Sequence, residues 1–111
     1  AQIEVEILSA GLEEIPAEVA QSITEATLQA IDNALRHSGA SKIRVLLGQV
    51  DAPGILVRVI DNGQGFNLER LPKDRLGIRN SIQARMRSVA GSAEIVSETG
   101  AGTTVVLGWS R

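Results

Sequence analysis

The segment DNGQGF, which starts at Asp61, places a carboxylate at the end of an apolar run and two glycines, Gly63 and Gly65, just after it. Glycine lacks a Cβ, so the backbone there can turn sharply and approach a ligand closely. A carboxylate at the mouth of a buried strand can accept a hydrogen bond from an amino group such as that of adenine. The plain alternative is a strand-to-loop turn, since Asn-Gly is a common turn dipeptide.

A second candidate is a polar row on a predicted helix. Gln29, Asn33 and His37 are spaced four residues apart, so they lie on successive turns of one helix face, with Arg36 beside them. A carboxamide, a guanidinium and an imidazole can together hold a hydrated cation and an anionic ligand. The alternative is a solvent-facing helix side, in which His37 orients or caps the helix end.

Two further glycine segments could bind phosphate. In TGAGTT, Gly100 and Gly102 could bring backbone amides to a phosphate, and Thr103 could add a hydroxyl group. A plain hairpin turn is the alternative there. In LGIRNS, Gly77 is expected to precede a helix whose N-terminal amides favour an anion.

The elements that must position these residues follow from apolar periodicity. Alternation predicts strands over residues 1–8, 42–50, 55–61, 92–98 and 105–109. Helical spacing predicts one helix from Pro16 to the HSGAS segment and another from Leu76 to Val89. The order β–α–β–β–α–β–β predicts an α+β two-layer sandwich, with both helices on one face of a mixed, mostly antiparallel sheet. The first helix is expected to turn these residues towards the core: Ala20, Ile23, Leu28, Ile31 and Leu35.

Composition narrows the function classes. A length of 111 residues fits one domain. The absence of cysteine excludes disulfide scaffolds, thiolate metal sites and cysteine nucleophiles, and one histidine argues against a multi-histidine zinc site. Two aromatic residues and a net charge of −2 argue against a nucleic-acid partner. No apolar run approaches the ~18 residues that a membrane span needs, and no Gly-Lys-Ser/Thr phosphate loop is present.

Charge is unevenly distributed along the chain. Residues 1–32 contain glutamates and one aspartate but no lysine or arginine, whereas residues 70–88 contain five arginines, one lysine and a single acid. The basic segment is either a solvated face or the rim of an anion site.

The four candidate segments occur in a recognisable order. A polar helix with an asparagine, Asp-x-Gly-x-Gly, a glycine at a helix start and a Gly-x-Gly-Thr hairpin together resemble the N box and the three glycine boxes of the GHKL ATPases, whose fold is the Bergerat sandwich. Within that superfamily, DNALRHSGASKIRV is similar to the N box of sensor histidine kinases, particularly the class that pairs with NarL-type response regulators. The resemblance runs from about Ile3 to Trp109. It implies a single catalytic ATP-binding (HATPase) domain, residues 1–111, excised from a longer kinase.

The resemblance also implies a role for each matched residue. Asn33 would hold Mg²⁺ between the phosphates of ATP, and Asp61 would read the adenine amino group. Asn33 and Arg36 would act in catalysis, because phosphoryl transfer depends mainly on positioning and charge neutralisation. The other matched residues divide between the two ends of ATP: Arg36, His37 and Gly77 at the phosphates, and Gly63, Gly65, Gly100, Gly102 and Thr103 at the base. The segment Asn67–Arg75 would form a short lid, with Lys73 and Arg75 as phosphate contacts.

The implied function is that of a two-component kinase. The domain would bind Mg-ATP and donate the γ-phosphate to a histidine on its own dimerisation domain, for relay to a response regulator. It would be cytoplasmic, with no nucleic-acid partner and no direct membrane contact, although many intact relatives are membrane-anchored. Gln29 stands where many members carry a glutamate, and glutamine cannot act as a general base, so we expect little activity from the domain alone. Two alternatives stay open: an anti-sigma-factor serine kinase of the same superfamily, and a degenerate, non-catalytic nucleotide-binding module.

Overall fold

The computed structural model describes residues 2–7, 15–48 and 54–110. Its strands and helices follow the predicted β–α–β–β–α–β–β order, which is thereby confirmed. The elements are β1 (Gln2–Ile7), α1 (Ala17–His37), β2 (Lys42–Gly48), β3 (Gly54–Asp61), α2 (Lys73–Arg87), β4 (Ser92–Ser97) and β5 (Thr103–Ser110), with a short 3₁₀ helix η1 (Leu68–Arg70) before α2. The predicted turn between β2 and β3 falls largely outside the described residues.

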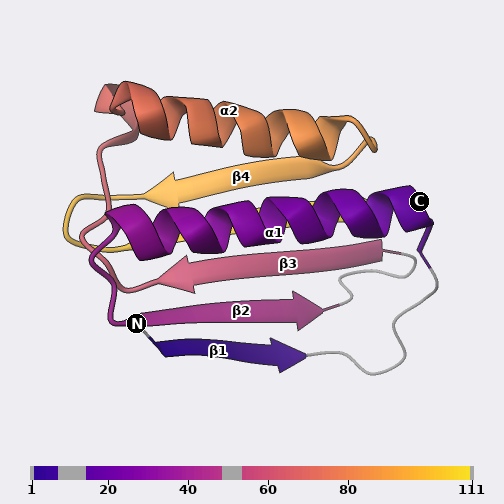
Figure 1. Ribbon diagram of the computed structural model, residues 1–111, viewed down its shortest axis with the longest axis horizontal. Coiled ribbons are helices and arrows are strands. Elements are labelled where there is room, and N and C mark those ends of the chain that lie inside the picture. The colour runs from indigo at the N-terminus through magenta and orange to yellow at the C-terminus, as the bar shows by residue number, and fades with distance from the viewer. Residues whose placement is uncertain (1, 8–14, 49–53, 111) are drawn as a thin grey trace.

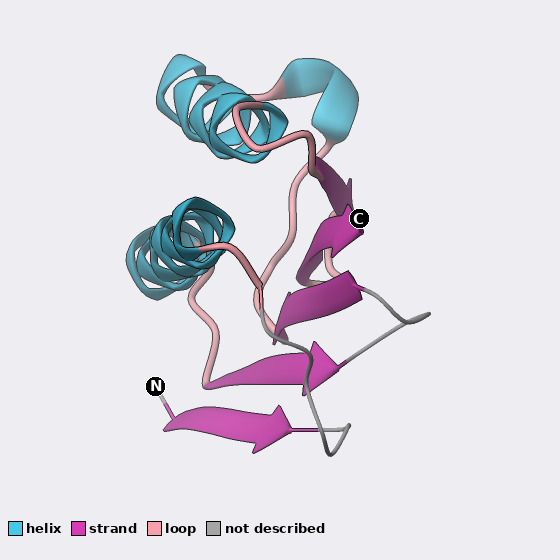
Figure 2. Cartoon of the chain, turned by 90° about the vertical axis from the view of Figure 1, so that its right-hand side faces the viewer, coloured by secondary structure: helices cyan, strands magenta, loops and turns pink. Residues whose placement is uncertain are grey.

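The strands form one five-stranded sheet in the order β1-β2-β3-β5-β4. β1 pairs with β2 in parallel, and the three other pairings are antiparallel, so the sheet is mixed and mostly antiparallel as predicted. A parallel pair needs a long crossover, and α1 provides it between β1 and β2. Both helices lie on the same face of the sheet (Figure 2). The α+β two-layer sandwich is therefore confirmed.

The helices run antiparallel to each other and cover part of the sheet (Figure 1). α1 packs over β3 and β5, and α2 packs over β4 and β5. β3 is the most enclosed strand: Ile55, Val57 and Val59 point into the core, and Asp61 ends the same inward row. Among the described residues, neither helix is long and apolar enough to cross a membrane.

The buried stripe of α1 differs from the predicted one. It consists of Val19, Ile23, Ala26, Ala30 and Ala34. Of the predicted core residues, Ile23 is buried, Ala20 and Ile31 are half-buried, and Leu28 and Leu35 are 59% and 49% exposed. The prediction followed the largest apolar side chains, whereas the three alanines let the helix lie close to the sheet. Leu28 instead lines an apolar groove of about 270 Å³ beside β1 and β2, together with Val5 and Leu47.

The second helix begins earlier than the sequence periodicity predicts. α2 starts at Lys73 rather than Leu76, directly after Pro72. Proline's fixed φ is suited to a helix start, so the polar residues that follow it are helical although they carry no apolar repeat. Gly77 consequently lies in the second turn of α2 and does not precede the helix, which corrects its predicted position.

Candidate functional site

The site is built around a buried carboxylate at one end of the sheet. Asp61, the last residue of β3, is paired in register with Thr103, the first residue of β5. Only 8% of Asp61 is exposed, and its Oδ1 accepts a hydrogen bond from the Gly63 amide at 2.9 Å. Burial raises the pKa of Asp61 above its ordinary value, and hydrogen bonds from the Gly63 and Thr103 amides partly offset that rise.

The loop after β3 is fastened to the end of α1. The Gln64 amide donates to the Ser38 carbonyl oxygen at 2.8 Å, and the Gln64 side-chain amide donates to the His37 carbonyl oxygen at 3.1 Å. A Cβ at Gly63 would collide with the Ser38 carbonyl oxygen. Glycine at this position therefore allows the loop to lie directly against the C-terminal end of the helix that carries Asn33.

The same loop is also fastened to the β4–β5 hairpin. The Phe66 amide donates to Ser97 Oγ at 2.9 Å. Ser97 Oγ also donates to the Gly102 carbonyl oxygen at 3.0 Å and lies 2.8 Å from Thr103 Oγ1. A buried serine thus joins the two glycine segments, which lie far apart in the chain.

Sequence reasoning missed Ser97. The signal was present, because β4 alternates and its inward positions read Ala93, Ile95 and Ser97. A hydroxyl at an inward strand position needs a hydrogen-bond partner, and it therefore marks a local polar network.

Two glycines of the site have backbone conformations that side chains disfavour. Gly65 has a φ of +63° and Gly102 a φ of +76°. A Cβ at Gly65 would collide with the Glu98 carbonyl oxygen, and one at Gly102 with the Asp61 carbonyl oxygen. Both glycines are thus required by chain packing. The predicted roles, Gly65 in making room for an adenine base and Gly102 in a loop near that base, stay predictions.

Five of the predicted site residues line one small cavity: Asn33, His37, Asp61, Gly65 and Thr103. Ser38 and Phe66 complete its lining, and its volume is about 10 Å³. That volume is about one water molecule's worth of space and far too small for a nucleotide. The cavity therefore marks where α1, the glycine loop and β5 meet, and a nucleotide there would have to displace part of the lining.

Other predicted residues lie outside this cavity. Arg36 is exposed on α1, and its Nε donates to Asp32 Oδ1 at 3.0 Å. Gly77 is exposed on α2, with open space where a Cβ would be, and as the fifth residue of that helix it has no free N-terminal amide. Gly100 also borders open space, with a φ of +84°. The structure therefore brings the asparagine and aspartate segments together in one cavity, whose lining does not include Gly77.

The polar row of α1 faces α2. His37 Nε2 lies 4.0 Å from Asp74 Oδ2, and Gln29 Oε1 accepts a 3.4 Å hydrogen bond from Ser81 Oγ. Farther along, Glu25 forms an ion pair with Arg85. We call this line of paired side chains between the two antiparallel helices the α1–α2 seam. The alternative of a purely solvent-facing polar row is therefore wrong for Gln29 and His37.

Asn33 lies in the seam between these pairs, and its Oδ1 is buried without a hydrogen-bond partner. A buried amide oxygen with no partner is rare in folded proteins and needs an explanation. Amide oxygens are hard ligands of the kind that Mg²⁺ accepts, and Mg²⁺ is held mostly by water and substrate phosphates with few protein ligands. The described residues contain no cluster of three or more His, Cys, Asp or Glu side chains that could hold a metal ion.

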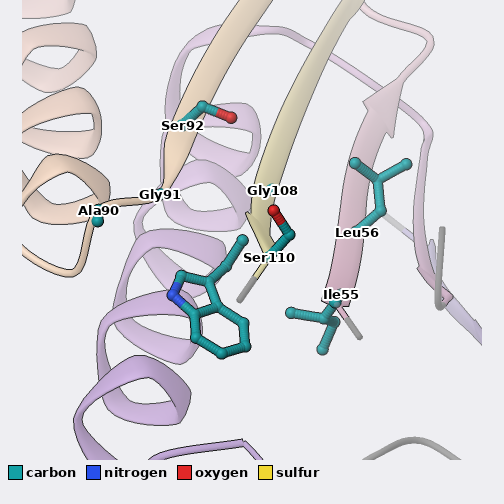
Figure 3. A pocket seen from close by; sticks show the side chains of 9 residues that line it. Ile55, Leu56, Ala90, Gly91, Ser92, Gly108 and Ser110 are labelled. Atoms are coloured by element: carbon teal, nitrogen blue, oxygen red, sulfur yellow. The ribbon is translucent and has the colours of Figure 1, made fainter. Parts of the chain in front are cut away.

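A larger cavity, of about 360 Å³, lies at the opposite end of the sheet (Figure 3). It is formed where β3 begins, β5 ends and α2 connects to β4, and it includes Leu56, Gly91, Gly108 and Trp109. The described residues that line it carry no ionisable side chain and include none of the predicted site residues. The predicted site residues Asn33, His37, Asp61, Gly65 and Thr103 line the small cavity at the other end.

The family of the chain follows from a match over most of its length. The model of the histidine kinase-, DNA gyrase B- and HSP90-like ATPase family matches residues 18–110. The chain belongs to this family. The match spans all four segments that carried the sequence resemblance, so the resemblance to the ATPase superfamily is confirmed.

Relatives of this ATPase domain are sensor kinases. The sensor histidine kinase LiaS of Bacillus subtilis is 38% identical over 77 residues, which cover 69% of this chain and 21% of LiaS. The sensor protein VraS of Staphylococcus epidermidis is 33% identical over 93 residues, covering 83% of this chain and 26% of VraS. The chain thus spans about a fifth to a quarter of the relatives it matches.

Solved structures share the fold of this ATPase domain. The histidine kinase domain of the blue-light activated histidine kinase of Erythrobacter litoralis aligns with a TM-score of 0.76 and 18% identity, over 96% of this chain and 50% of that one. The histidine kinase AdeS of Acinetobacter baumannii aligns with a TM-score of 0.73 and 19% identity, over 98% and 53% of the two chains. At these identities the comparison supports the fold alone.

Proposed function

We propose that this domain binds Mg-ATP and donates the γ-phosphate to a histidine on a helical dimerisation domain of the same kinase. The phosphate would then pass to an aspartate of a response regulator. The observation that carries the proposal is the meeting of Asn33 and Asp61 in one cavity, one with an unpartnered amide oxygen and the other with a buried carboxylate. The sensor kinases among the relatives support the same reading.

Recognition of the base falls to Asp61. A carboxylate offers about four lone-pair positions, and the amides of Gly63 and Thr103 occupy only part of that capacity. The remainder can accept a hydrogen bond from the exocyclic amino group of adenine. Guanine has a carbonyl oxygen at the corresponding ring position, so the same carboxylate would repel it. The proposal therefore includes selectivity for ATP over GTP.

The phosphates would extend from the carboxylate towards the α1–α2 seam. Asn33 Oδ1 would ligate a Mg²⁺ ion carried by the phosphates, and the ion would supply charge neutralisation for the transfer. Gln29 cannot accept a proton as a base, and its Oε1 already accepts a hydrogen bond from Ser81. The chain therefore contributes positioning and electrostatics, which are the main requirements of phosphoryl transfer.

Calorimetric titration with ATP and with GTP, each with and without Mg²⁺, tests the binding step. We expect binding of ATP and not GTP, a Mg²⁺ dependence that Asn33→Asp alters, and loss of ATP binding in Asp61→Asn. Thr99→Ala, an exposed change in the same hairpin as Thr103, is the control and should bind like the parent. ATP binding by Asp61→Asn at the parental affinity would overturn the site assignment.

Transfer is tested separately, with the domain joined to the helical segment of its own kinase and radiolabelled ATP. Label on a histidine of that segment supports the histidine kinase. Label on a serine of an antagonist protein instead identifies the serine kinase alternative. Tight ATP binding without transfer to either identifies a non-catalytic nucleotide-binding module.

A further inference from the structure

The core-facing stripe of α2 changes character along the helix. Near its C-terminal end Ile82 and Met86 are 1% and 0% exposed and pack into the core. Arg79 lies three residues before Ile82, and Arg75 lies four residues before Arg79, so both arginines lie on the same face of α2 as Ile82 and Met86. Two guanidinium groups therefore continue a line of core residues, at the end of α2 that lies nearest to His37.

Both arginines have a buried N–H group without a partner. The Nε atoms of Arg75 and Arg79 are buried and make no hydrogen bond, and neither side chain forms an ion pair with any part of the chain that the structure describes. Arg85 also has a buried, unbonded Nε, but its guanidinium pairs with Glu25 across the seam. A buried N–H without an acceptor is costly, and these two belong to half-exposed cationic side chains that an anion can reach, so Arg75 and Arg79 point to an anion as the missing acceptor.

The seam register places these donors beside Asn33. His37 lies near Asp74 and Gln29 near Ser81, so Asn33, halfway between His37 and Gln29, is level with Gly77 and Ile78 on α2, and Arg79 follows directly after them. The four described side-chain atoms that are buried without a partner are Asn33 Oδ1 and the three arginine Nε atoms, all on these two helices. A ligand that carries both a divalent cation and phosphate oxygens would satisfy Asn33 Oδ1 and the Nε donors of Arg75 and Arg79 together.

We propose that Arg79, assisted by Arg75, binds the polyphosphate tail of the nucleotide from the α2 side of the seam. The inference rests on the proposed function and adds a residue that the sequence resemblance did not assign. It makes Arg79 a determinant of affinity for the tail and leaves adenine recognition to Asp61. Nucleotides with a polyphosphate tail should therefore depend on Arg79, and a nucleoside should not.

The first test compares ATP and adenosine binding to the parent and to Arg79→Met by NMR titration, which measures millimolar dissociation constants. We expect ATP affinity to fall about tenfold to hundredfold, as for loss of charge-assisted hydrogen bonds, and adenosine affinity to stay unchanged. Arg87→Met, an exposed change of the same charge on the same helix, should lower ATP affinity less than about twofold. Equal ATP affinity in Arg79→Met and the parent would overturn the inference.

The second test separates a phosphate role from a structural one by thermal unfolding with and without Mg-ATP. Arg79 has no partner in the free domain, so Arg79→Met should not lower the Tm of the free domain, and it should reduce the ATP-induced rise in Tm. Arg85 pairs with Glu25, so Arg85→Met should lower the Tm of the free domain and keep the ATP-induced rise. A lowered free Tm with an intact ATP response in Arg79→Met would make it a structural residue.

These outcomes are distinguishable from failure of the proposed function. If the parent domain binds neither ATP nor adenosine, the nucleotide site itself is wrong, and Arg79 as a polyphosphate ligand is wrong with it. If the parent binds ATP selectively and Arg79→Met binds it equally well, the nucleotide site stands and the inference about Arg79 fails.

Discussion

Ser97 Oγ accepts a 2.9 Å hydrogen bond from the amide of Phe66, and through this contact the hairpin β4–β5 holds the glycine loop that follows β3. The same hydroxyl bonds to the Gly102 carbonyl oxygen. One small polar side chain thereby fixes the relative positions of two segments that are separated in the sequence by about thirty residues. The position of the glycine loop at the candidate nucleotide site therefore depends on that hydroxyl group.

Replacing Ser97 by alanine should therefore destabilise the domain. The change leaves the Phe66 amide and the Gly102 carbonyl oxygen without a buried partner, so we expect the free energy of unfolding to fall by about 1–3 kcal/mol. Urea denaturation measures this difference. Ser92→Ala in the same strand is the control, because Ser92 is exposed, and it should change the free energy by less than about 0.5 kcal/mol. Equal effects of the two variants would show that the Ser97 network contributes nothing.

Alanine substitutions at Gly39 and Gly65 should distinguish the cost of backbone strain from the cost of a steric collision. Gly39 and Gly65 have similar φ values, +66° and +63°, but a Cβ at Gly39 meets no atom within 4 Å, whereas one at Gly65 collides with Glu98. Gly39→Ala should cost about 1–2 kcal/mol of unfolding free energy from φ alone. Gly65→Ala should cost about 3 kcal/mol or more, because the loop must also move away from the hairpin. Chemical denaturation of both variants tests this order, and similar losses would contradict the collision.

The raised pKa of Asp61 predicts a pH-dependent effect of Asp61→Asn. A pKa that is higher in the folded state than in the unfolded state means that the neutral carboxyl is favoured on folding. The corresponding stability is present below the ordinary aspartate pKa of about 3.9 and is lost as the pH rises through the raised value. Asparagine stays neutral throughout. The unfolding free energy of the variant minus that of the parent should therefore increase as the pH rises.

Thermal or urea unfolding between about pH 3 and pH 7 measures that difference. Glu69→Gln, an exposed change on η1, controls for the loss of one surface charge. A difference for Asp61→Asn that is flat with pH, or that falls as the pH rises, would show that burial does not oppose ionisation of this carboxylate.

The alanine stripe of α1 predicts unequal effects of two similar truncations. Ile23 is 5% exposed and belongs to the core, so Ile23→Ala should lower the free energy of unfolding by about 2–5 kcal/mol. Leu28 is 59% exposed, so Leu28→Ala should change it by less than about 1 kcal/mol. Urea denaturation compares them. A large loss of unfolding free energy in Leu28→Ala would show that the predicted leucine face is part of the core.

Local sequence patterns determined the order of the elements and the mixed sheet, and they singled out four candidate segments. Alternation in KIRVLLG and ILVRVID specifies strands because one face of each is buried, and the tight turns after Asp61 and around Gly102 require glycine. The polar spacing of Gln29, Asn33 and His37 also marked one helix face correctly. These features depend on residues close together in the chain, so the sequence alone contains them.

Tertiary packing decided which side of each helix is buried and which side chains of α2 contact the polar row of α1. Three alanines let α1 approach the sheet more closely than leucines would, and that choice depends on the opposing strands. α2, placed against α1 by the fold, turns the polar row into a seam and leaves Asn33 Oδ1, Arg75 and Arg79 without partners. Contacts between segments so distant in the chain arise only when the whole sheet and both helices have assembled, because no local pattern encodes the distance between them.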